Sequence, residues 1–261
     1  MSELYQGLAD RLAAAYRGGP VEPLRDGLDP TDADGAYAVQ AINTRRWQQL
    51  GRRIVGRKIG LTAKAVQRQL GVDQPDFGVL FDDMRIANGG TLALNTLIQA
   101  KAEAEVALVL GTDLGGADVT PDQVADATAQ AFAAIEIVDS RIAEWRITFA
   151  DTVADNGSSS HFVLADEGRK LAGLDLYSCG MVLEVNGQVA SLGAGAAALD
   201  HPLKAAAWLA RTLASRGEML RAGDIVLTGA LGPMVTLKPG DTVRAIVGGL
   251  GDCAFTCGEA A

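Results

Sequence analysis

Three glutamates in two short apolar segments are the residues best suited to metal chemistry. Glu103 and Glu105 lie in AEAEVALVL (102–110), and Glu136 lies in IEIVDSRI (135–142). If residues 102–110 form a β-strand, alternate side chains share a face. Glu103 and Glu105 then lie roughly 7 Å apart on one face of the strand. The side chains on its opposite face are all apolar. Such carboxylates can converge on one hard cation, Mg²⁺ or Mn²⁺.

Glu136 interrupts a second apolar strand, because Ile135 and Ile137 would both face the core. An unpaired carboxylate in such surroundings is costly, and metal ligation would remove that cost. Two simpler interpretations stay open. An E-x-E pair on a strand is most often part of a solvated outer face, and Glu136 could pair with Arg141 or Arg146. Only the three glutamates together favour a metal site.

The elements that must position these glutamates form a helical N-terminal part and a β-rich body. The spacing of apolar residues predicts helices over residues 3–17, 31–51, 63–72, 120–134 and 201–217. The segment 52–62 is β-branched and predicts a strand. From residue 76 onward, short apolar runs alternate with Gly, Pro, Asn and Asp. We therefore expect a helical part over 1–75 and a β-rich catalytic body over 76–261, together one compact unit.

Local signals predict two turns and one helix cap. Asn186-Gly187 between alternating strands predicts a hairpin, and residues 238–241 (KPGD) predict a Pro-Gly turn. Asp200 is a plausible N-cap for the last helix. His161 and His201, the only two histidines, have no partner at ligand spacing and are interpreted as structural.

Composition excludes several classes of protein. Hydrophobic residues make up 48% of the 261 residues, which allows a sizeable core, and the formal net charge is -9. We find no basic patch for a nucleic-acid partner and no run of about 18 apolar residues for a membrane span. Without a visible signal peptide, a cytoplasmic location with the thiols of Cys179, Cys253 and Cys257 reduced is expected.

Beyond the glutamates, six motifs resemble those of the 2-keto-4-pentenoate hydratases, a branch of the fumarylacetoacetate hydrolase superfamily. They occur in the same order and spacing, and the resemblance covers nearly the whole chain from about residue 35. The motifs are GRKIGLT (56–62), GVDQPDFGVLF (71–81), EAE (103–105), EIVDSRI (136–142), DNGSSSHFVL (155–164) and LTGALGPMV (227–235).

The resemblance implies an α+β fold, a mixed β-roll of the fumarylacetoacetate hydrolase type with a smaller helical N-terminal part. It also implies a homo-oligomer, in this family often built on pentamers. A complex with a downstream aldolase or with a decarboxylase belongs to the same expectation. The cofactor that it implies is Mg²⁺ or Mn²⁺, held by Glu103, Glu105 and Glu136.

The same resemblance gives roles to residues that the pattern alone leaves ordinary. Lys58 and Asp76, otherwise a surface lysine and a turn former, become the candidate acid/base groups, with their individual roles open. Substrate contacts are implied for the loop after Asn156 and for the LTGALG segment. The candidate substrate-binding residues are Ser159, Ser160, Leu231 and Gly232, with the choice between the two serines open.

The implied reaction is the hydration of a small 2-hydroxy-2,4-dienoate to a 4-hydroxy-2-oxo acid, in the meta-cleavage degradation of aromatic compounds. The first alternative is 2-oxo-3-hexenedioate (4-oxalocrotonate) decarboxylation, and LTGALGPMV favours the hydratase. A second alternative, an acylpyruvate hydrolase, commonly uses an N-terminal histidine, and this chain has no histidine before residue 161. A third, a non-catalytic partner subunit of the decarboxylase, disagrees with the intact glutamate triad.

Overall fold

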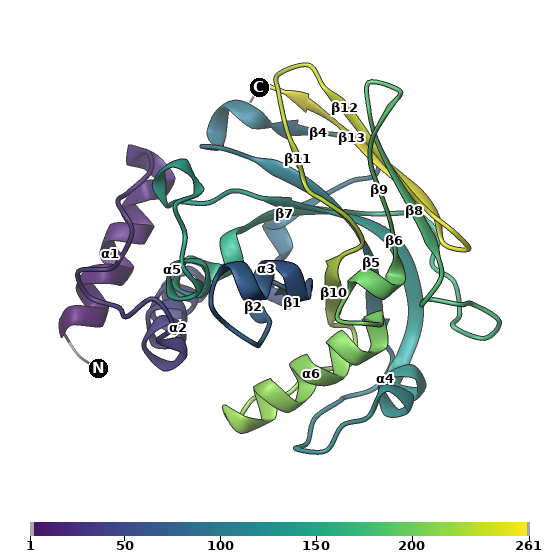
Figure 1. The fold of residues 1–261 in the computed structure, drawn as a ribbon, viewed down its shortest axis with the longest axis horizontal. Helices are drawn as coiled ribbons and strands as arrows, with labels where there is room; N and C mark the ends of the chain where they lie inside the picture. Colours follow the sequence, from purple (N-terminus) through teal and green to yellow (C-terminus); the bar gives the residue numbers. More distant parts are fainter. Residues whose placement is uncertain (1–2, 260–261) are drawn as a thin grey trace.

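Two β-sheets of unequal size form the body of the molecule in a computed structural model that describes residues 3–259 (Figure 1). The main sheet has the strand order β2-β1-β10-β5-β6-β7-β3, and β11 adds to β5. Its β1–β10 and β3–β7 pairs are parallel, and the other pairs are antiparallel. The strands are β1 (Ile54–Gly60), β2 (Asp76–Phe81), β3 (Arg85–Ile86), β5 (Lys101–Leu110), β6 (Thr128–Val138), β7 (Ser159–Leu164), β10 (Ile225–Ala230) and β11 (Val235–Thr236).

The second sheet packs on the apolar face of the first. Its strand order is β4-β13-β12-β8-β9, and only the β13–β4 pair is parallel. β12 and β13 lie against β5 and β6 of the main sheet. The strands are β4 (Gly90–Ala93), β8 (Gly180–Val185), β9 (Gln188–Ala194), β12 (Thr242–Val247) and β13 (Gly251–Gly258).

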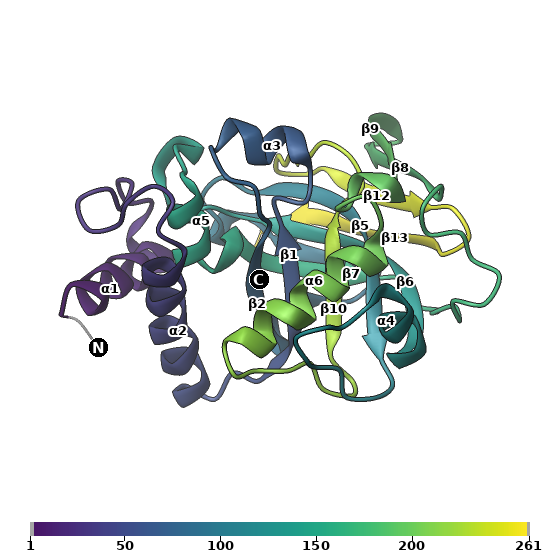
Figure 2. The same ribbon diagram turned by 60° about the horizontal axis from the view of Figure 1, so that its bottom comes forward.

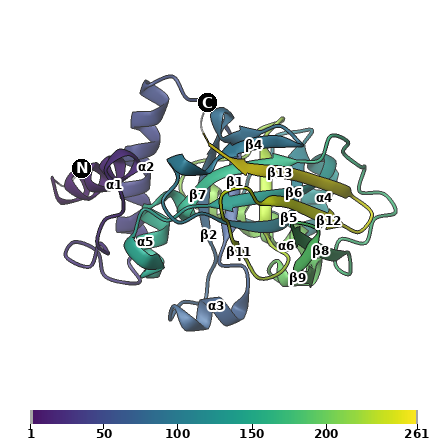
Figure 3. The ribbon, with the colours of Figure 1, turned by 90° about the horizontal axis from the view of Figure 1, so that it is seen from above.

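Helices cover the ends and one side of this β structure. Figures 1 and 3 show α1, α2 and α5 grouped at one end of the sheets, and Figure 2 shows α6 lying across β1 and β10. The helices are α1 (Glu3–Gly18), α2 (Ala33–Gln49), α3 (Lys64–Gln69), α4 (Pro121–Ala127), α5 (Phe149–Ala154) and α6 (Pro202–Ser215). Short 3-10 turns occur at Asp82–Met84, Leu94–Thr96, Ala143–Trp145, Asn156–Ser158 and Gly195–Ala197.

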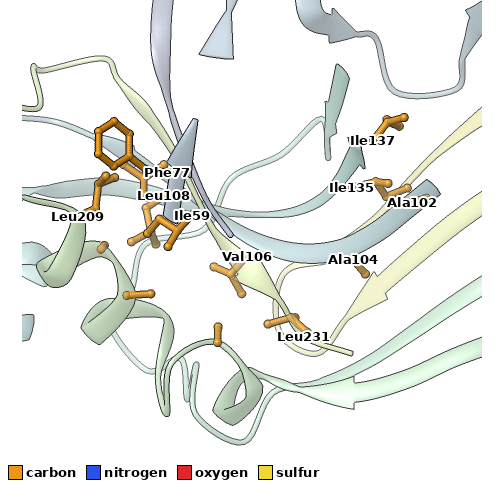
Figure 4. Close-up of a cluster of buried hydrophobic side chains, with 14 of the residues drawn as sticks. Ile59, Phe77, Ala102, Ala104, Val106, Leu108, Ile135, Ile137, Leu209 and Leu231 are labelled. Carbon is orange, nitrogen blue, oxygen red and sulfur yellow. The ribbon is translucent and has the colours of Figure 1, made fainter. Parts of the chain in front are cut away.

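The main hydrophobic core lies between the two sheets and α6. Alternation along β5 sends Ala104, Val106 and Leu108 to this side, where they meet Leu209 of α6 and Ile135 of β6 (Figure 4). The apolar face expected for residues 102–110 is therefore confirmed. Because alternate residues of a strand face opposite ways, the glutamates of β5 must lie on the other side of the main sheet.

The expected α+β fold with a curled sheet and a helical N-terminal part is confirmed. The hairpin is also confirmed, because Asn186 and Gly187 join β8 to β9 with φ of 53° and 73°, as a type I′ turn requires. The turn at 238–241 closes with a 3.1 Å bond from the Asp241 N–H to the Lys238 carbonyl. The division at residue 75/76 stays a prediction, and β1 lies before it yet belongs to the main sheet.

Two local predictions are wrong. The helix expected over 120–134 ends at Ala127, and residues 128–138 form β6, paired on both sides with β5 and β7. Tertiary pairing here overrides the helix propensity of an Ala-rich segment. The N-cap of α6 is His201, whose Nδ1 accepts from the Leu203 N–H at 3.0 Å. Asp200 instead pairs with Lys64.

Other expectations from composition can be compared with the structure. The thiols of Cys179, Cys253 and Cys257 are free and buried. Within residues 3–259, no helix is both long enough and apolar enough to cross a bilayer.

Candidate metal centre

Strand register brings the three glutamates together on one face of the main sheet. Glu103 of β5 lies directly opposite Glu136 of β6, and Glu105 follows two residues along β5. One carboxylate oxygen from each glutamate lies within 4.8 Å of the other two. Glu105 and Glu136 are fully buried, and Glu103 is half-buried. The solvated-face interpretation of E-x-E is therefore wrong.

Three of the six carboxylate oxygens are buried without a hydrogen-bond partner among the described residues. One oxygen of Glu105 accepts from the Gly229 N–H at 2.8 Å, but its Oε1 and both oxygens of Glu136 accept no hydrogen bond. Lys58 Nζ lies 3.3 Å from Glu136 Oε2, at ion-pair distance. Such orphaned buried anions are expensive, and a divalent cation with oxygen ligands fits this set.

The pKa values of the glutamates reflect the same crowding. Burial, only partly offset by Lys58, raises the pKa of Glu136 to about 7. Burial also raises the pKa of Glu105 well above its usual range, and the charges of Glu136 and Glu103 add to this effect. Because a bound cation favours the ionised form, a cation held by these glutamates would displace their protons.

Lys58 and Asp76 share the sheet face of the glutamates. Lys58 of β1 is paired with Leu227 of β10 and Gly78 of β2, and Gly60 is paired with Asp76. Both side chains are buried. The surface-lysine and turn-former interpretations are therefore wrong.

Lys58 and Asp76 also lie close together at the end of β1. A Cβ atom at Gly60 would lie 2.2 Å from Asp76 Oδ1 and 3.2 Å from Lys58 Nζ. Residue 60 therefore has to be glycine, because both side chains pack on its Cα. Oδ1 of Asp76 has no hydrogen-bond partner among the described residues, so it can accept a proton or a water molecule.

The two groups are electrostatically opposed. Burial disfavours the charged form of Lys58, but Glu136, Asp76 and the β5 glutamates outweigh burial and raise its pKa. Burial raises the pKa of Asp76, against the effect of Lys58. Lys58 therefore stays an ammonium, while the raised pKa of Asp76 makes its carboxylate a stronger base than an exposed aspartate.

A loop after α5 holds the lysine in place. The methylene chain of Lys58 lies between two glycines: an added Cβ would lie 3.2 Å from its Cδ at Gly78 and 3.1 Å at Gly157. The neighbouring Asn156 holds β2 through two bonds to Val79, accepting from the N–H at 2.7 Å and donating to the carbonyl at 3.0 Å. Residues 156–158 all have positive φ, an uncommon backbone that tends to occur at functional sites.

The two candidate serines have different surroundings. Ser159 is fully buried, its Oγ has no partner among the described residues, and it lies opposite Val138, two residues beyond Glu136 along β6. Ser160 Oγ lies 2.8 Å from His161 Nδ1. Burial lowers the pKa of His161, which favours a neutral ring. The unpartnered hydroxyl makes Ser159 the stronger candidate of the two.

A cavity of about 470 Å³ reaches the glutamate cluster at Glu103. Gly232 lines this cavity, whereas the Leu231 side chain lies in the main core (Figure 4). The remaining lining is mostly alkyl and comes from Ile59, Leu61, Ala63, Val66, Ala197, Ala230, Pro233 and Met234, with Gly60 and Thr62. Among these residues none is cationic, so the cavity favours an uncharged group.

The arginine partners proposed for Glu136 lie elsewhere. Arg141 Nε pairs with Asp155 Oδ1 at 2.6 Å, and Arg146 pairs with Glu22. Both pairings leave Glu136 to Lys58, so the arginine alternative is wrong. Arg141 also donates to the Ser159 carbonyl at 3.2 Å, and it thereby stabilises the loop that contacts Lys58.

The LTGALG segment, implied by the resemblance to contact substrate, contains Gly229, but its partner could not be predicted. Gly229 donates its N–H to Glu105 with φ of 105°. Sequence reasoning did not identify Asn156, because the contact of its amide with β2 depends on the tertiary fold. The lining residues Ala197 and Val66 were also missed, because their approach to the cavity depends on the fold and not on local spacing.

Comparison with known proteins agrees with this geometry. Residues 53–257 match the family model described as fumarylacetoacetate (FAA) hydrolase C-terminal. The chain belongs to the fumarylacetoacetate hydrolase family. It is 54% identical over 240 residues to 2-keto-4-pentenoate hydratase 2 of Dechloromonas aromatica (strain RCB), covering 92% of each chain. It is 52% identical to 2-keto-4-pentenoate hydratase of Burkholderia vietnamiensis (strain G4 / LMG 22486), covering 97% of each. The hydratase branch is therefore its place in the family.

A solved structure of a related enzyme superposes closely on this fold. The 4-oxalocrotonate decarboxylase from Pseudomonas putida G7, complexed with magnesium and adipate, gives a TM-score of 0.92 at 34% identity, covering 97% of each chain. That decarboxylase was one of the alternatives raised by the sequence. The fold alone therefore does not distinguish hydration from decarboxylation. The residues that line the cavity are needed to distinguish the two reactions.

Proposed function

We propose that this protein is a metal-dependent hydro-lyase that adds water to a 2-hydroxy-2,4-dienoate to give a 4-hydroxy-2-oxo acid. The observation that carries the proposal is the buried Glu103–Glu105–Glu136 cluster beside Lys58 and Asp76 at the end of an alkyl-lined cavity. Relatives of more than 50% identity are named 2-keto-4-pentenoate hydratases, which supports the same reaction. Its setting would be the meta-cleavage degradation of aromatic compounds.

The glutamate cluster would hold Mg²⁺ or Mn²⁺, because all its donors are carboxylate oxygens. When bound, such a cation supplies stabilisation of negative charge on the carboxylate and C2 oxygen of the substrate. Lys58 stays protonated and adds a second positive charge at the same place. The acidic protein thereby gains the local cations that an anionic substrate needs.

Proton transfer falls to Lys58 and Asp76. Moving the dienol proton from O2 to C5 gives a conjugated 2-oxo-3-enoate, and water then adds at C4. Asp76, with its unpartnered Oδ1, is suited to accept a proton from that water, and Lys58 is suited to supply the proton that C3 takes up as the C3–C4 double bond is lost. Ser159 would donate its free hydroxyl to the substrate carboxylate. Gly232 would border the carbon chain, and Leu231 would act through its backbone position.

The cavity argues against the decarboxylase. The substrate of the decarboxylase, a hexenedioate, carries a second carboxylate. Burying that charge without a cation is costly. No lysine or arginine occurs among the lining residues. The nearby Lys64 is 61% exposed and pairs with Asp200. The lining therefore favours a vinyl or alkyl end.

The decisive experiment compares the two substrates under identical conditions. The purified protein with Mg²⁺ should remove the ultraviolet absorbance of 2-hydroxypenta-2,4-dienoate, and release no CO₂ from 2-oxo-3-hexenedioate. Glu103→Gln should abolish hydration while the fold survives. CO₂ release at a comparable rate, or full hydratase activity after chelation, would refute the proposal.

Assembly belongs to the same proposal. A homo-oligomer built on pentamers, and association with a downstream aldolase or a decarboxylase, follow from family membership. Analytical ultracentrifugation of the purified chain, alone and mixed with the partner enzymes, tests both.

A further inference from the structure

A second cavity lies at the outer end of β5. Its volume is about 520 Å³, and it shares no lining residue with the cavity that reaches Glu103. Its walls are mainly alkyl and aromatic, from Leu94, Leu97, Ile98, Trp145, Leu237 and Pro239. Lys101 is the only cationic residue among those that line it.

Lys101 has no salt bridge among residues 3–259. Its ammonium lies 4.3 Å from the centre of the Trp145 ring, in a cation–π contact. Lys101 is half-buried. A half-buried cation without a salt bridge is well placed to receive an anion.

The backbone presents the Trp145 ring to this lysine at some cost. Glu144 and Trp145 have φ of 57° and 54° in succession, a left-handed conformation that such side chains disfavour. The indole N–H donates to the Gln99 carbonyl at 3.0 Å, which fixes the ring. Strain of this kind persists where the surroundings determine it and clusters at binding sites.

We propose that this cavity binds a small organic anion with a flat apolar body, whose carboxylate pairs with Lys101 and whose body lies along Trp145 and the alkyl walls. Glu259 also lines the cavity but is exposed, so solvent screens its charge. Lys101 and Glu103 share one face of β5, two residues apart. The site therefore lies beside the metal centre as a separate place for an anion.

Benzoate and its neutral analogue benzamide test the anion requirement on metal-free protein. The chain has three tryptophans, so labelling with 5-fluorotryptophan gives three ¹⁹F resonances, assigned by single Trp→Phe variants. Benzoate should shift the Trp145 resonance saturably and leave Trp47 and Trp208 unchanged. The affinity of benzamide should be lower than that of benzoate by at least about tenfold, as expected for the loss of one charged contact.

Two lysine variants and one competitor complete the experiment. Lys101→Met keeps the aliphatic stem and should weaken benzoate at least about tenfold, while Lys170→Met, an exposed lysine in a loop, should not. Mg²⁺ with oxalate, which should occupy the metal centre, should not displace benzoate. Equal binding of benzamide, an unaffected Lys101→Met, displacement by Mg²⁺–oxalate, or no shift at Trp145 would each overturn the proposal. Because the assay uses metal-free protein, its outcome is independent of the proposed hydratase activity.

Discussion

At the scale of single residues, the charges of the three glutamates and Lys58 depend on one another. Glu105 and Glu136 are fully buried acids with unpartnered oxygens, and one lysine cannot neutralise three glutamates. Each group shifts the pKa of the others. A cation held by these glutamates would therefore compete with protons for the same oxygens.

This competition predicts the pH dependence of metal binding. Burial raises the pKa of Glu136 to about 7, so below pH 7 a bound proton has to leave before the cation binds. Affinity for Mg²⁺ should fall up to about tenfold per pH unit as the pH drops below 7. Calorimetric titrations at pH 6, 7 and 8, in buffers of different ionisation enthalpy, measure both affinity and proton release. A constant affinity over this range would contradict the assignment.

Lys58 is the residue whose removal should separate catalysis from metal binding. Lys58→Met should lower kcat about 10²–10⁴-fold, the usual contribution of a positioned acid or base. Metal affinity should be kept or should rise, because a neighbouring cation is lost. The control is Lys64→Met, since Lys64 is exposed and pairs only with Asp200. A parallel loss of metal and activity in Lys58→Met would make the lysine structural instead.

At the scale of elements, the loop 156–158 connects α5, at the helical end of the molecule, to β7 of the main sheet. Asn156 bonds to β2, Gly157 contacts Lys58, and Arg141 donates to the Ser159 carbonyl. These contacts of the loop therefore help to set the position of the lysine. The effect of this loop on activity can be tested by adding one methyl group at Gly157.

Gly157→Ala should reduce activity far more than stability alone explains. At φ of 62° an alanine costs about 1 kcal/mol, and its Cβ would also lie 3.1 Å from Lys58 Cδ. Gly187→Ala is a matched control, because Gly187 has φ of 73° and nothing within 4 Å of an added Cβ. Both variants should lose similar stability in urea, but only Gly157→Ala should lower kcat, by about tenfold or more. Equal activities would mean that the lysine does not depend on this contact.

The sequence predicted those elements whose pattern is local. Alternation placed Glu103 and Glu105 on one face of a strand, and Asn186-Gly187 marked its hairpin. The segment 128–134 was misassigned because its alanines favour a helix, while pairing with β5 and β7 makes it a strand. Lys58 could not be called buried from its neighbours in the chain. Its burial depends on the parallel pairing of β1 with β10, about 170 residues away.

At the scale of the whole molecule, the site joins parts of the chain that are distant in sequence. β1 and β2 supply Lys58 and Asp76, β5 and β6 supply the glutamates, and β10 supplies the N–H of Gly229. The folded protein therefore brings three carboxyl groups together in a mostly buried place, which is costly when no cation is bound there. The stability of the metal-free protein should carry that cost.

Metal should consequently stabilise the whole fold. A cation at a hundred times its Kd adds about 2.7 kcal/mol, which for a chain of this size raises Tm by about 5–10 °C. Glu105→Gln removes one buried charge, so the metal-free variant should melt higher than the metal-free parent, while its response to Mg²⁺ should be largely lost. Glu184→Gln on β8 of the second sheet is the matched control, and it should respond to Mg²⁺ like the parent. Scanning calorimetry with Mg²⁺ and after chelation measures all three proteins. An unchanged Tm of the parent on chelation would show that the glutamate cluster holds no stabilising cation.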